Sequence, residues 1–292
     1  MLSFLLTEGL DQFYKEDPKI NKKSWHLGGP ELLVTAIYVS ERFIPHQKEA
    51  KALQMAGIFW QLVEKKEFIP VLRKQDLSQP GKKALLAIEG GEPLNSIEDL
   101  YAFYRLGVRM LSFTWNYQNH LATGCMEDYL GGFTQKGKEI AKEAQNLGFI
   151  FDVSHLSEGS FWDLCKGTNS PLIASHSNVY TLCNHKRNLK DEQIKAIAEK
   201  KGVVGINFCS EFLEEANIQA VVRHISYIAS KFGVDYVGIG SDFLGFSKLT
   251  KGLENISKWL SLDEALQKEG FNKTEREKVL GGNFQRVFDK AL

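Results

Sequence analysis

The sequence predicts an α/β protein, a (β/α)8 TIM barrel whose first strand is missing. Short apolar segments alternate with amphipathic ones along the chain, which is typical of a parallel sheet with helices outside it. The chain has 292 residues, and α/β barrels commonly form one domain from about 250 residues. An amphipathic segment, and not an apolar one, stands almost at Met1.

The first expected element is a helix over residues 3–14. Its apolar side chains recur at helical spacing; they are Leu5, Leu6, Leu10 and Phe13. No strand-like segment precedes it, so it has the character of a helix whose own strand is missing. The next segment, residues 32–38, is apolar and β-branched with little polar alternation, as in a strand covered on both faces.

The run over residues 32–38 opens seven strand-and-helix units. The other strands are expected at residues 84–88 and 108–113 and in segments that end at Val153, Ser175, Asn207 and Ser241. The clearest helices are expected at residues 45–66, 97–106, 136–147, 191–201, 220–232 and 261–268. A (β/α)8 barrel needs one more strand.

One domain over residues 1–292 is expected, because no repeat, low-complexity tract or Pro/Ser-rich linker interrupts the alternation. The alternative fold is an open doubly wound sheet. Its phosphate-binding Gly-x-Gly-x-x-Gly after the first strand is absent, and Gly238-Ile239-Gly240 lies within an expected strand. The barrel is therefore preferred.

Charge and cysteine content restrict the class of partner. The 36 basic residues balance 36 acidic ones, so no net charge draws the protein to nucleic acid or to an anionic membrane. A small-molecule partner is predicted. The four cysteines form no Cys-x-x-Cys pair, which predicts reduced, mostly buried thiols. Without a signal peptide or an apolar run of about 20 residues, a cytoplasmic protein is expected.

Polar side chains stand at or just after the ends of the expected strands, where parallel barrels place their active sites. They are Glu89, His155, His176, Asn207 and Asp242. Imidazole and carboxylate are the ligands of catalytic zinc, and a carboxylate can bridge two ions. Any one of these histidines alone is better explained as a structural residue, but aligned strand-end groups favour a metal site.

Each single residue also has a simpler interpretation. Asp242 could cap a turn, and Glu89 could be a solvated loop acid, although Gly90 and Gly91 after it would allow close approach of backbone to a metal or substrate. Arg187 could bind a carboxylate through two hydrogen bonds or belong to a solvated basic loop. Trp115 could line a pocket or cover the barrel rim.

Tyr117 has the same two interpretations as Trp115, and Lys186 is better explained as part of a solvated loop. Cys183 and Cys209 are interpreted as packing residues. Four histidines receive no chemical role; they are His26, His46, His120 and His224.

Several ordered motifs together resemble the membrane (renal) dipeptidase family of zinc peptidases. They are Ala87-Ile88-Glu89-Gly90-Gly91, Phe151-Asp152-Val153-Ser154-His155, Ser175-His176-Ser177, Lys186-Arg187-Asn188-Leu189, Gly202–Phe208, Gly240-Ser241-Asp242-Phe243, Gly252–Asn255 and Gly281–Phe288. The similarity covers nearly the whole chain.

The resemblance implies a (β/α)8 barrel of the metal-dependent hydrolase type with two zinc ions, which cleaves dipeptides and tolerates a D-residue at the carboxyl side. It implies that Glu89 bridges the metals and that His155 and His176 complete one zinc site. Asp242 would serve the second site and proton transfer. The nucleophile would be a metal-bound hydroxide, because zinc lowers the pKa of water from 15.7 toward ~7.

The resemblance also assigns the substrate side of the site. Arg187 would hold the carboxylate of a small dipeptide, and Trp115 and Asn207 would contact the substrate. A homodimer is compatible with this interpretation.

Two departures from the family pattern limit the expected activity. The first strand of the family carries a His-x-Asp pair that binds the second zinc, and no such pair precedes the helix at residues 3–14. One zinc or none is then expected to be well held.

Trp115 stands where many relatives have a substrate-binding histidine, and Leu244 stands where an aspartate is common. Two alternatives to an active dipeptidase therefore stay open: a catalytically impaired barrel with a partial metal site, and another metal-dependent barrel hydrolase such as a phosphoesterase.

Overall fold

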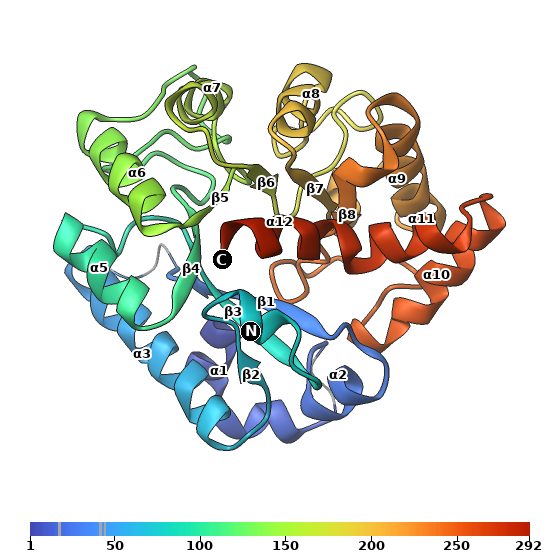
Figure 1. The fold of residues 1–292 in the computed structure, drawn as a ribbon, viewed down its shortest axis with the longest axis horizontal. Helices are drawn as coiled ribbons and strands as arrows, with labels where there is room; N and C mark the ends of the chain where they lie inside the picture. The colour runs from blue at the N-terminus through green and yellow to red at the C-terminus, as the bar shows by residue number, and fades with distance from the viewer. Residues whose placement is uncertain (17–18, 41–42, 44) are drawn as a thin grey trace. The chain divides into compact units, whose positions relative to one another are not determined.

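The structure is a computed structural model that describes residues 1–16, 19–40, 43 and 45–292. The chain divides into two compact units. The first unit comprises Met1–Gln12, Glu31–Ser170 and Asp289–Leu292, and the second comprises Phe13–Pro30 and Pro171–Phe288. Each unit contains parallel strands and helices, with elements labelled in Figure 1.

The first unit is built on a parallel sheet in the order β1-β3-β4-β5, with β2 paired to β3. Its strands are β1 (Leu32–Tyr38), β2 (Ile69–Pro70), β3 (Lys83–Glu89), β4 (Val108–Ser112) and β5 (Ile150–Asp152). All residues of β3 before Glu89 are buried, as expected for a central strand of a parallel sheet. Glu89 therefore stands at the point where β3 leaves the core.

The helices of the first unit begin where short polar side chains cap them. They are α1 (Leu2–Glu8), α3 (Pro45–Glu64), α4 (Lys74–Leu77), α5 (Ile97–Arg105), α6 (Gln135–Leu147) and α7 (Glu158–Gly167). Ser96, Thr134 and Ser157 each accept a hydrogen bond from a backbone N–H in the first turn of α5, α6 and α7. Such N-caps satisfy N–H groups that have no partner inside the helix.

The second unit has the parallel order β6-β7-β8. Its strands are β6 (Leu172–Ala174), β7 (Val203–Ile206) and β8 (Val237–Ile239). Its α-helices are α2 (Lys22–Gly28), α8 (Asp191–Glu199), α9 (Ile218–Lys231), α10 (Trp259–Lys268) and α11 (Lys273–Glu277). Short helical turns are η2 (Ser210–Phe212), η3 (Val234–Tyr236), η4 (Ile256–Lys258) and η5 (Lys278–Gly282), while η1 (Leu10–Tyr14) and α12 (Asn283–Ala291) run from one unit to the other.

Glycine in β7 is required by close packing within the second unit. A Cβ on Gly205 would lie 2.3 Å from the carbonyl oxygen of Ser175. That contact is too close for any larger residue unless the backbone moves. The same carbonyl would lie 1.9 Å from a Cβ on Gly240, just after β8. These glycines let the backbones around β6, β7 and β8 approach one another closely.

The prediction of parallel βα units is confirmed: each of the seven expected strands corresponds to a strand between β1 and β8. β2 could not be predicted from the sequence, because its two residues are too few for a hydrophobic pattern. The expected helix over residues 3–14 was wrong in its continuity. It breaks at Gly9, whose φ of 99° and ψ of 149° are incompatible with a helix. The complete (β/α)8 barrel, its missing strand and the single domain stay predictions.

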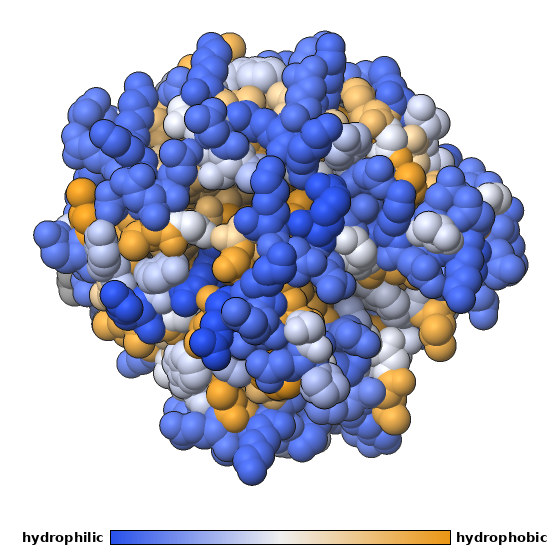
Figure 2. Space-filling view, viewed as in Figure 1, coloured by the Kyte–Doolittle hydropathy of each residue, from blue (hydrophilic) through white to orange (hydrophobic). Residues whose placement is uncertain are grey.

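The face drawn in Figure 2 is mostly hydrophilic, with apolar atoms scattered among polar ones. Among the described residues, no helix is long and apolar enough to cross a membrane. All four cysteines are free, but only Cys209 is buried and the other three are half-buried, so the expectation of mostly buried thiols was wrong.

Candidate functional site

The first unit brings Glu89 and His155 into contact. Glu89 is the last residue of β3, and His155 lies three residues after β5 ends. The His155 Nε2 atom lies 3.0 Å from Glu89 Oε1, and the two side chains are 5% and 17% exposed. The carboxyl ends of these parallel strands thus place an imidazole against a carboxylate, as the sequence predicted for this pair.

Asn116 determines which nitrogen of His155 faces Glu89. The Nδ1 atom of His155 lies 2.9 Å from Asn116 Oδ1. A carboxamide oxygen only accepts hydrogen bonds, so Nδ1 carries a hydrogen in this arrangement. In the neutral ring the lone pair is then on Nε2, which points at another acceptor, Glu89 Oε1. Two acceptors so close require a proton or a cation between them, and this pair fits a metal ion.

The backbone around His155 adopts a conformation that side chains rarely take. His155 has a φ of 70° and Asn116 a φ of 59°, both in the left-handed region that favours glycine. The carbonyl of His155 accepts hydrogen bonds from Thr114 Oγ1 at 2.9 Å and from the Cys125 amide at 2.8 Å. These contacts from the loop after β4 hold the strained turn in place.

Aromatic rings surround this pair in the first unit. The Trp115 ring lies 5.9 Å from the His155 ring, and the Tyr38 ring lies 4.8 Å from that of Trp115. Trp115 therefore lies beside the candidate ligands rather than at a distant rim. Tyr117 is 49% exposed, which fits a rim position and not a buried pocket wall.

The two glycines after Glu89 accommodate the protein's own side chains. A Cβ on Gly90 would lie 2.4 Å from Glu92 Oε2, and one on Gly91 would lie 2.5 Å from a methyl group of Leu121. The approach of a metal or substrate is therefore not needed to explain them. Burial raises the pKa of Glu92, although a hydrogen bond with Asn119 opposes this.

The second unit brings Asn207 and Asp242 together. The Asn207 side-chain amide donates to Asp242 Oδ2 at 3.0 Å. Asn207 is fully buried, and its own Oδ1 accepts from the Cys209 amide at 2.6 Å. These bonds fix the carboxamide so that its N–H faces the carboxylate. Asn207 therefore orients Asp242, which itself has a φ of 54°.

His176 and Arg187 also meet in the second unit. The Arg187 Nη2 atom donates to the carbonyl oxygen of His176 at 3.0 Å, and Ser175 Oγ lies 2.6 Å from His176 Nδ1. Arg187 is 4% exposed and lies over the Phe212 ring, with 5.6 Å between Cζ and the ring centre. The solvated-loop interpretation is thus wrong for Arg187, whereas it holds for the exposed Lys186.

Two charged or titratable neighbours of these residues were not among the predicted site residues. Burial lowers the pKa of Lys19, while the negative charge of Asp242 opposes that shift. The Lys19 ammonium donates to the carbonyl oxygen of Phe246 at 2.5 Å, in the loop that follows Asp242. Burial and the charge of Arg187 lower the pKa of His185. No local pattern points to Lys19, because more than 220 residues separate it from Asp242.

The sequence model of one protein family, the membrane dipeptidases (peptidase family M19), matches residues 17–292. The chain belongs to this family. The resemblance stated from its motifs is therefore confirmed. The matched range contains the strand-end residues Glu89, His155 and His176.

Comparison with known proteins extends this family assignment. An uncharacterized protein in the pqqA 5′ region of Klebsiella pneumoniae is 36% identical over 202 residues, which cover 65% of this chain and 74% of that protein. A dipeptidase AC of family M19, described as a metallopeptidase, superposes with a TM-score of 0.93 at 24% identity, covering 100% of this chain and 96% of its own.

A metallopeptidase from Rhodobacter sphaeroides, solved with a phosphinate mimic of the dipeptide L-Ala-D-Ala, superposes with a TM-score of 0.92 at 23% identity. The superposition covers 100% of this chain and 97% of that one. At this level of identity the two structural comparisons show a shared α/β fold. Together with the family match they indicate a metallopeptidase of the dipeptidase type.

Proposed function

We propose that this protein is a zinc-dependent dipeptidase. The observation that carries the proposal is the contact between His155 Nε2 and Glu89 Oε1 at 3.0 Å, with the other ring nitrogen turned to Asn116. Two lone-pair donors that face each other at a strand edge fit a divalent cation, and imidazole with carboxylate is a ligand set of catalytic zinc. Membership of a dipeptidase family supplies the reaction.

Glu89, His155 and His176 would hold one zinc, and Glu89 and Asp242 would hold a second. The family motifs support His176 and Asp242. The contact of His176 Nδ1 with Ser175 Oγ makes Nε2 the ligand atom that we propose for that ring. We propose that the first zinc is held more tightly than the second, because three of these residues would hold the first and two would hold the second.

The substrate proposed is a small dipeptide with a free carboxylate. Arg187 would bind that carboxylate, since its planar guanidinium matches a carboxylate with two parallel hydrogen bonds. Its burial strengthens this attraction, because little water screens the charge. Trp115 would contact the side of the substrate next to His155. The bound L-Ala-D-Ala mimic of the Rhodobacter sphaeroides protein supports a D-residue at the carboxyl side.

Bound zinc would supply a water molecule acidic enough to attack near neutral pH and would polarise the scissile carbonyl. The protein's own groups would manage the proton and the geometry. Asp242 would take the proton from water, and Asn207 would keep the Asp242 carboxylate in a single orientation through the 3.0 Å hydrogen bond. Arg187 would fix one end of the dipeptide.

Metal analysis and a dipeptide assay test the proposal together. The protein would be stripped of metal, reloaded with zinc and assayed on L-Ala-D-Ala and L-Ala-L-Ala. We expect at least one zinc per chain and hydrolysis that a chelator abolishes. His155→Ala should lose both, while His26→Gln, a change at an exposed histidine of α2, should keep both.

Three other outcomes would contradict the proposal. Zinc binding without hydrolysis would favour a catalytically impaired metal-binding protein. No zinc binding after reloading would remove the metal site itself. Hydrolysis of phosphate esters but not of dipeptides would favour another metal-dependent hydrolase.

A further inference from the structure

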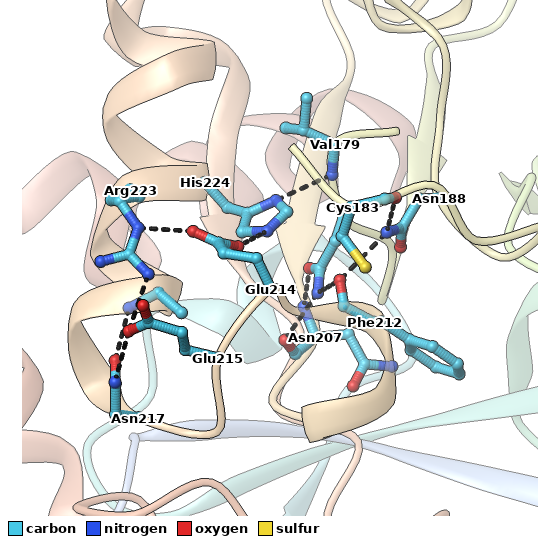
Figure 3. A network of polar contacts seen from close by, with 12 residues as sticks. Val179, Cys183, Asn188, Asn207, Phe212, Glu214, Glu215, Asn217, Arg223 and His224 are labelled. Atoms are coloured by element: carbon cyan, nitrogen blue, oxygen red, sulfur yellow. Dashed lines mark hydrogen bonds and ion pairs between the residues drawn. The ribbon is translucent and has the colours of Figure 1, made fainter. Parts of the chain in front are cut away.

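A buried histidine of the second unit lies at the centre of the polar network shown in Figure 3. His224, on α9, is 0% exposed. Its Nδ1 atom accepts a hydrogen bond from the backbone N–H of Val179 at 3.0 Å, and its Nε2 atom lies 3.0 Å from Glu214 Oε2. Both ring nitrogens thus have partners from segments distant in the sequence.

The partners of His224 determine its protonation state. A backbone N–H can only donate, so Nδ1 must keep its lone pair. Nε2 then carries the hydrogen, which it donates to the Glu214 carboxylate. His224 is therefore the neutral Nε2–H tautomer. Burial lowers its pKa, and the negative charge of Glu214 only partly opposes this shift.

Glu214 is itself held by a chain of charged groups. Burial alone would raise the pKa of Glu214, but its hydrogen bonds and the positive charge of Arg223 lower it overall. Arg223 Nε contacts Glu214 Oε1, and Arg223 Nη2 lies 3.3 Å from Glu215 Oε2. Glu215 Oε2 accepts from Asn217, the N-cap of α9, at 2.8 Å. The acceptor for His224 is thus fixed to the start of the same helix.

Val179 is the point through which His224 acts on the loop after β6. Val179 pairs with Leu189 in an isolated parallel β-bridge. The Val179 carbonyl oxygen accepts a hydrogen bond from the Cys183 amide at 3.1 Å. His176 lies three residues before Val179, and Arg187 lies two residues before Leu189. The contact of Val179 with α9 therefore lies at the base of the segment 176–189, which carries both residues.

Two asparagines also support the segment 176–189. The side-chain amides of Asn178 and Asn188 donate to the carbonyl oxygen of Phe212 at 3.1 and 3.0 Å. Both of these contacts reach η2, whereas the Val179 N–H reaches α9 through His224 (Figure 3). The histidine thus connects the segment to a helix that the asparagines do not reach.

We propose that His224, oriented by Glu214, is a positioning residue that fixes the segment 176–189 and thereby places Arg187 for the substrate carboxylate. The inference rests on the proposed function for the role of Arg187. The link from His224 to the segment rests on the hydrogen bonds alone. The two parts can therefore be tested separately.

The test compares His224→Leu, which removes both hydrogen bonds, with His224→Gln, which offers one acceptor and one donor and stays neutral. Hydrogen–deuterium exchange of a peptide covering residues 176–189 reports on the segment in the zinc-loaded full chain. We expect exchange in His224→Leu to be faster by roughly tenfold, the size expected for the loss of one buried hydrogen bond. His224→Gln should restore much of the protection, and His26→Gln should match the wild type.

Steady-state kinetics on the same variants test the substrate part. We expect KM for L-Ala-D-Ala to rise roughly tenfold in His224→Leu with a smaller change in kcat, as when binding common to ground and transition states is lost. His224→Gln should lower KM again. A fall in kcat with unchanged KM would overturn the placement of Arg187.

The outcomes separate the two proposals. If the wild type hydrolyses no dipeptide, the proposed function fails, while the exchange data still test the link between His224 and the segment. If exchange over residues 176–189 is the same in His224→Leu and the wild type, the positioning role fails even in an active enzyme. Should His224→Leu not fold, Glu214→Ala takes its place, because it removes the acceptor of His224 Nε2, and unchanged exchange in that variant would overturn the inference.

Discussion

At the scale of single residues, the side chains that orient the candidate ligands are as informative as the ligands. Asn116 turns Nδ1 of His155 toward itself, so that Nε2 faces Glu89. Hydrogen-bond partners of this kind commonly change metal affinity by 10- to 100-fold. Asn116 has no place in the motifs that indicate the family, and 39 residues separate it from His155.

We predict that Asn116→Gly lowers zinc affinity by about 10- to 100-fold, because it removes the acceptor for His155 Nδ1. Asn116→Asp is the matched control, since it keeps the acceptor. Both residues tolerate the φ of 59° at this position. Competition with a fluorescent zinc chelator measures the affinity. Equal affinity in the two variants would mean that Asn116 does not orient the ring.

His224 gives a prediction on stability against pH. Because its pKa is lowered in the folded protein, the unfolded chain takes up the proton first as pH falls. The contribution of neutral His224 to stability is therefore complete above about pH 6.5 and is lost as pH falls through the folded pKa. We expect urea unfolding at pH 7.5 and 5.5 to differ more in the wild type than in His224→Gln, which cannot titrate. An equal difference in both proteins would contradict this.

The sequence contained a sign of His224 that was not used. His224 shares the buried face of α9 with Ala220, Val221, Ile225 and Ile228. A histidine on such a face is buried and must find partners for both nitrogens. Which partners it finds could not be predicted, because Val179 reaches it only through the fold. The contact between Asn116 and His155 could not be predicted either, because it also depends on the fold. Glu89 and His155 themselves could be predicted, because they follow the ends of expected strands.

At the scale of elements, the pattern of apolar residues predicted that each strand exists but did not predict its exact end residues. Long buried strands such as β3 are unbroken apolar runs, so their existence followed from the sequence. β2 consists of Ile69–Pro70 and is defined by its pairing with β3, which no local pattern reveals. The break between α1 and η1 depends on the backbone angles of Gly9, and a hydrophobic pattern at helical spacing continues across it.

Gly9 allows a prediction with an internal comparison. With φ of 99° and ψ of 149°, it lies in a region open almost only to glycine. A Cβ there would also lie 2.7 Å from Asp11 Oδ1. We expect Gly9→Ala to lower the free energy of unfolding by about 1–3 kcal/mol. Gly57→Ala, within α3 and with no atom within 4 Å of the added Cβ, should raise it by roughly 0.4–1 kcal/mol. Urea denaturation distinguishes the two, and a loss of the same size in both would refute the argument.

At the scale of the whole molecule, the motifs carried the family assignment and composition only narrowed the class of partner. The balance of 36 basic and 36 acidic residues indicates neither nucleic acid nor an anionic membrane as a partner. The ordered motifs, by contrast, agree with a family match over residues 17–292. The fold class could be predicted because the alternation of strands and helices follows from short apolar and amphipathic segments of the sequence. The number and tightness of metal ions depend on distances that the sequence does not contain.

Zinc should stabilise the whole chain if the proposed site is correct. A ligand that binds only the folded state at 100 times its Kd adds about 2.7 kcal/mol to the free energy of unfolding. We therefore expect the Tm of the metal-free protein to rise on addition of zinc and to fall again with a chelator. His155→Ala should show no such shift, and His26→Gln should show all of it. A wild-type Tm that does not respond to zinc would count against the site.

The left-handed backbone at His155 has a consequence for laboratory evolution. Its φ of 70° is one that glycine adopts more easily, so the histidine is retained against the local preference of the backbone. A library selected only for heat resistance should therefore accumulate glycine at this position, and the selected proteins should be stable but inactive. Heat-resistant clones that lost activity would thus identify the site without any assay of metal or substrate.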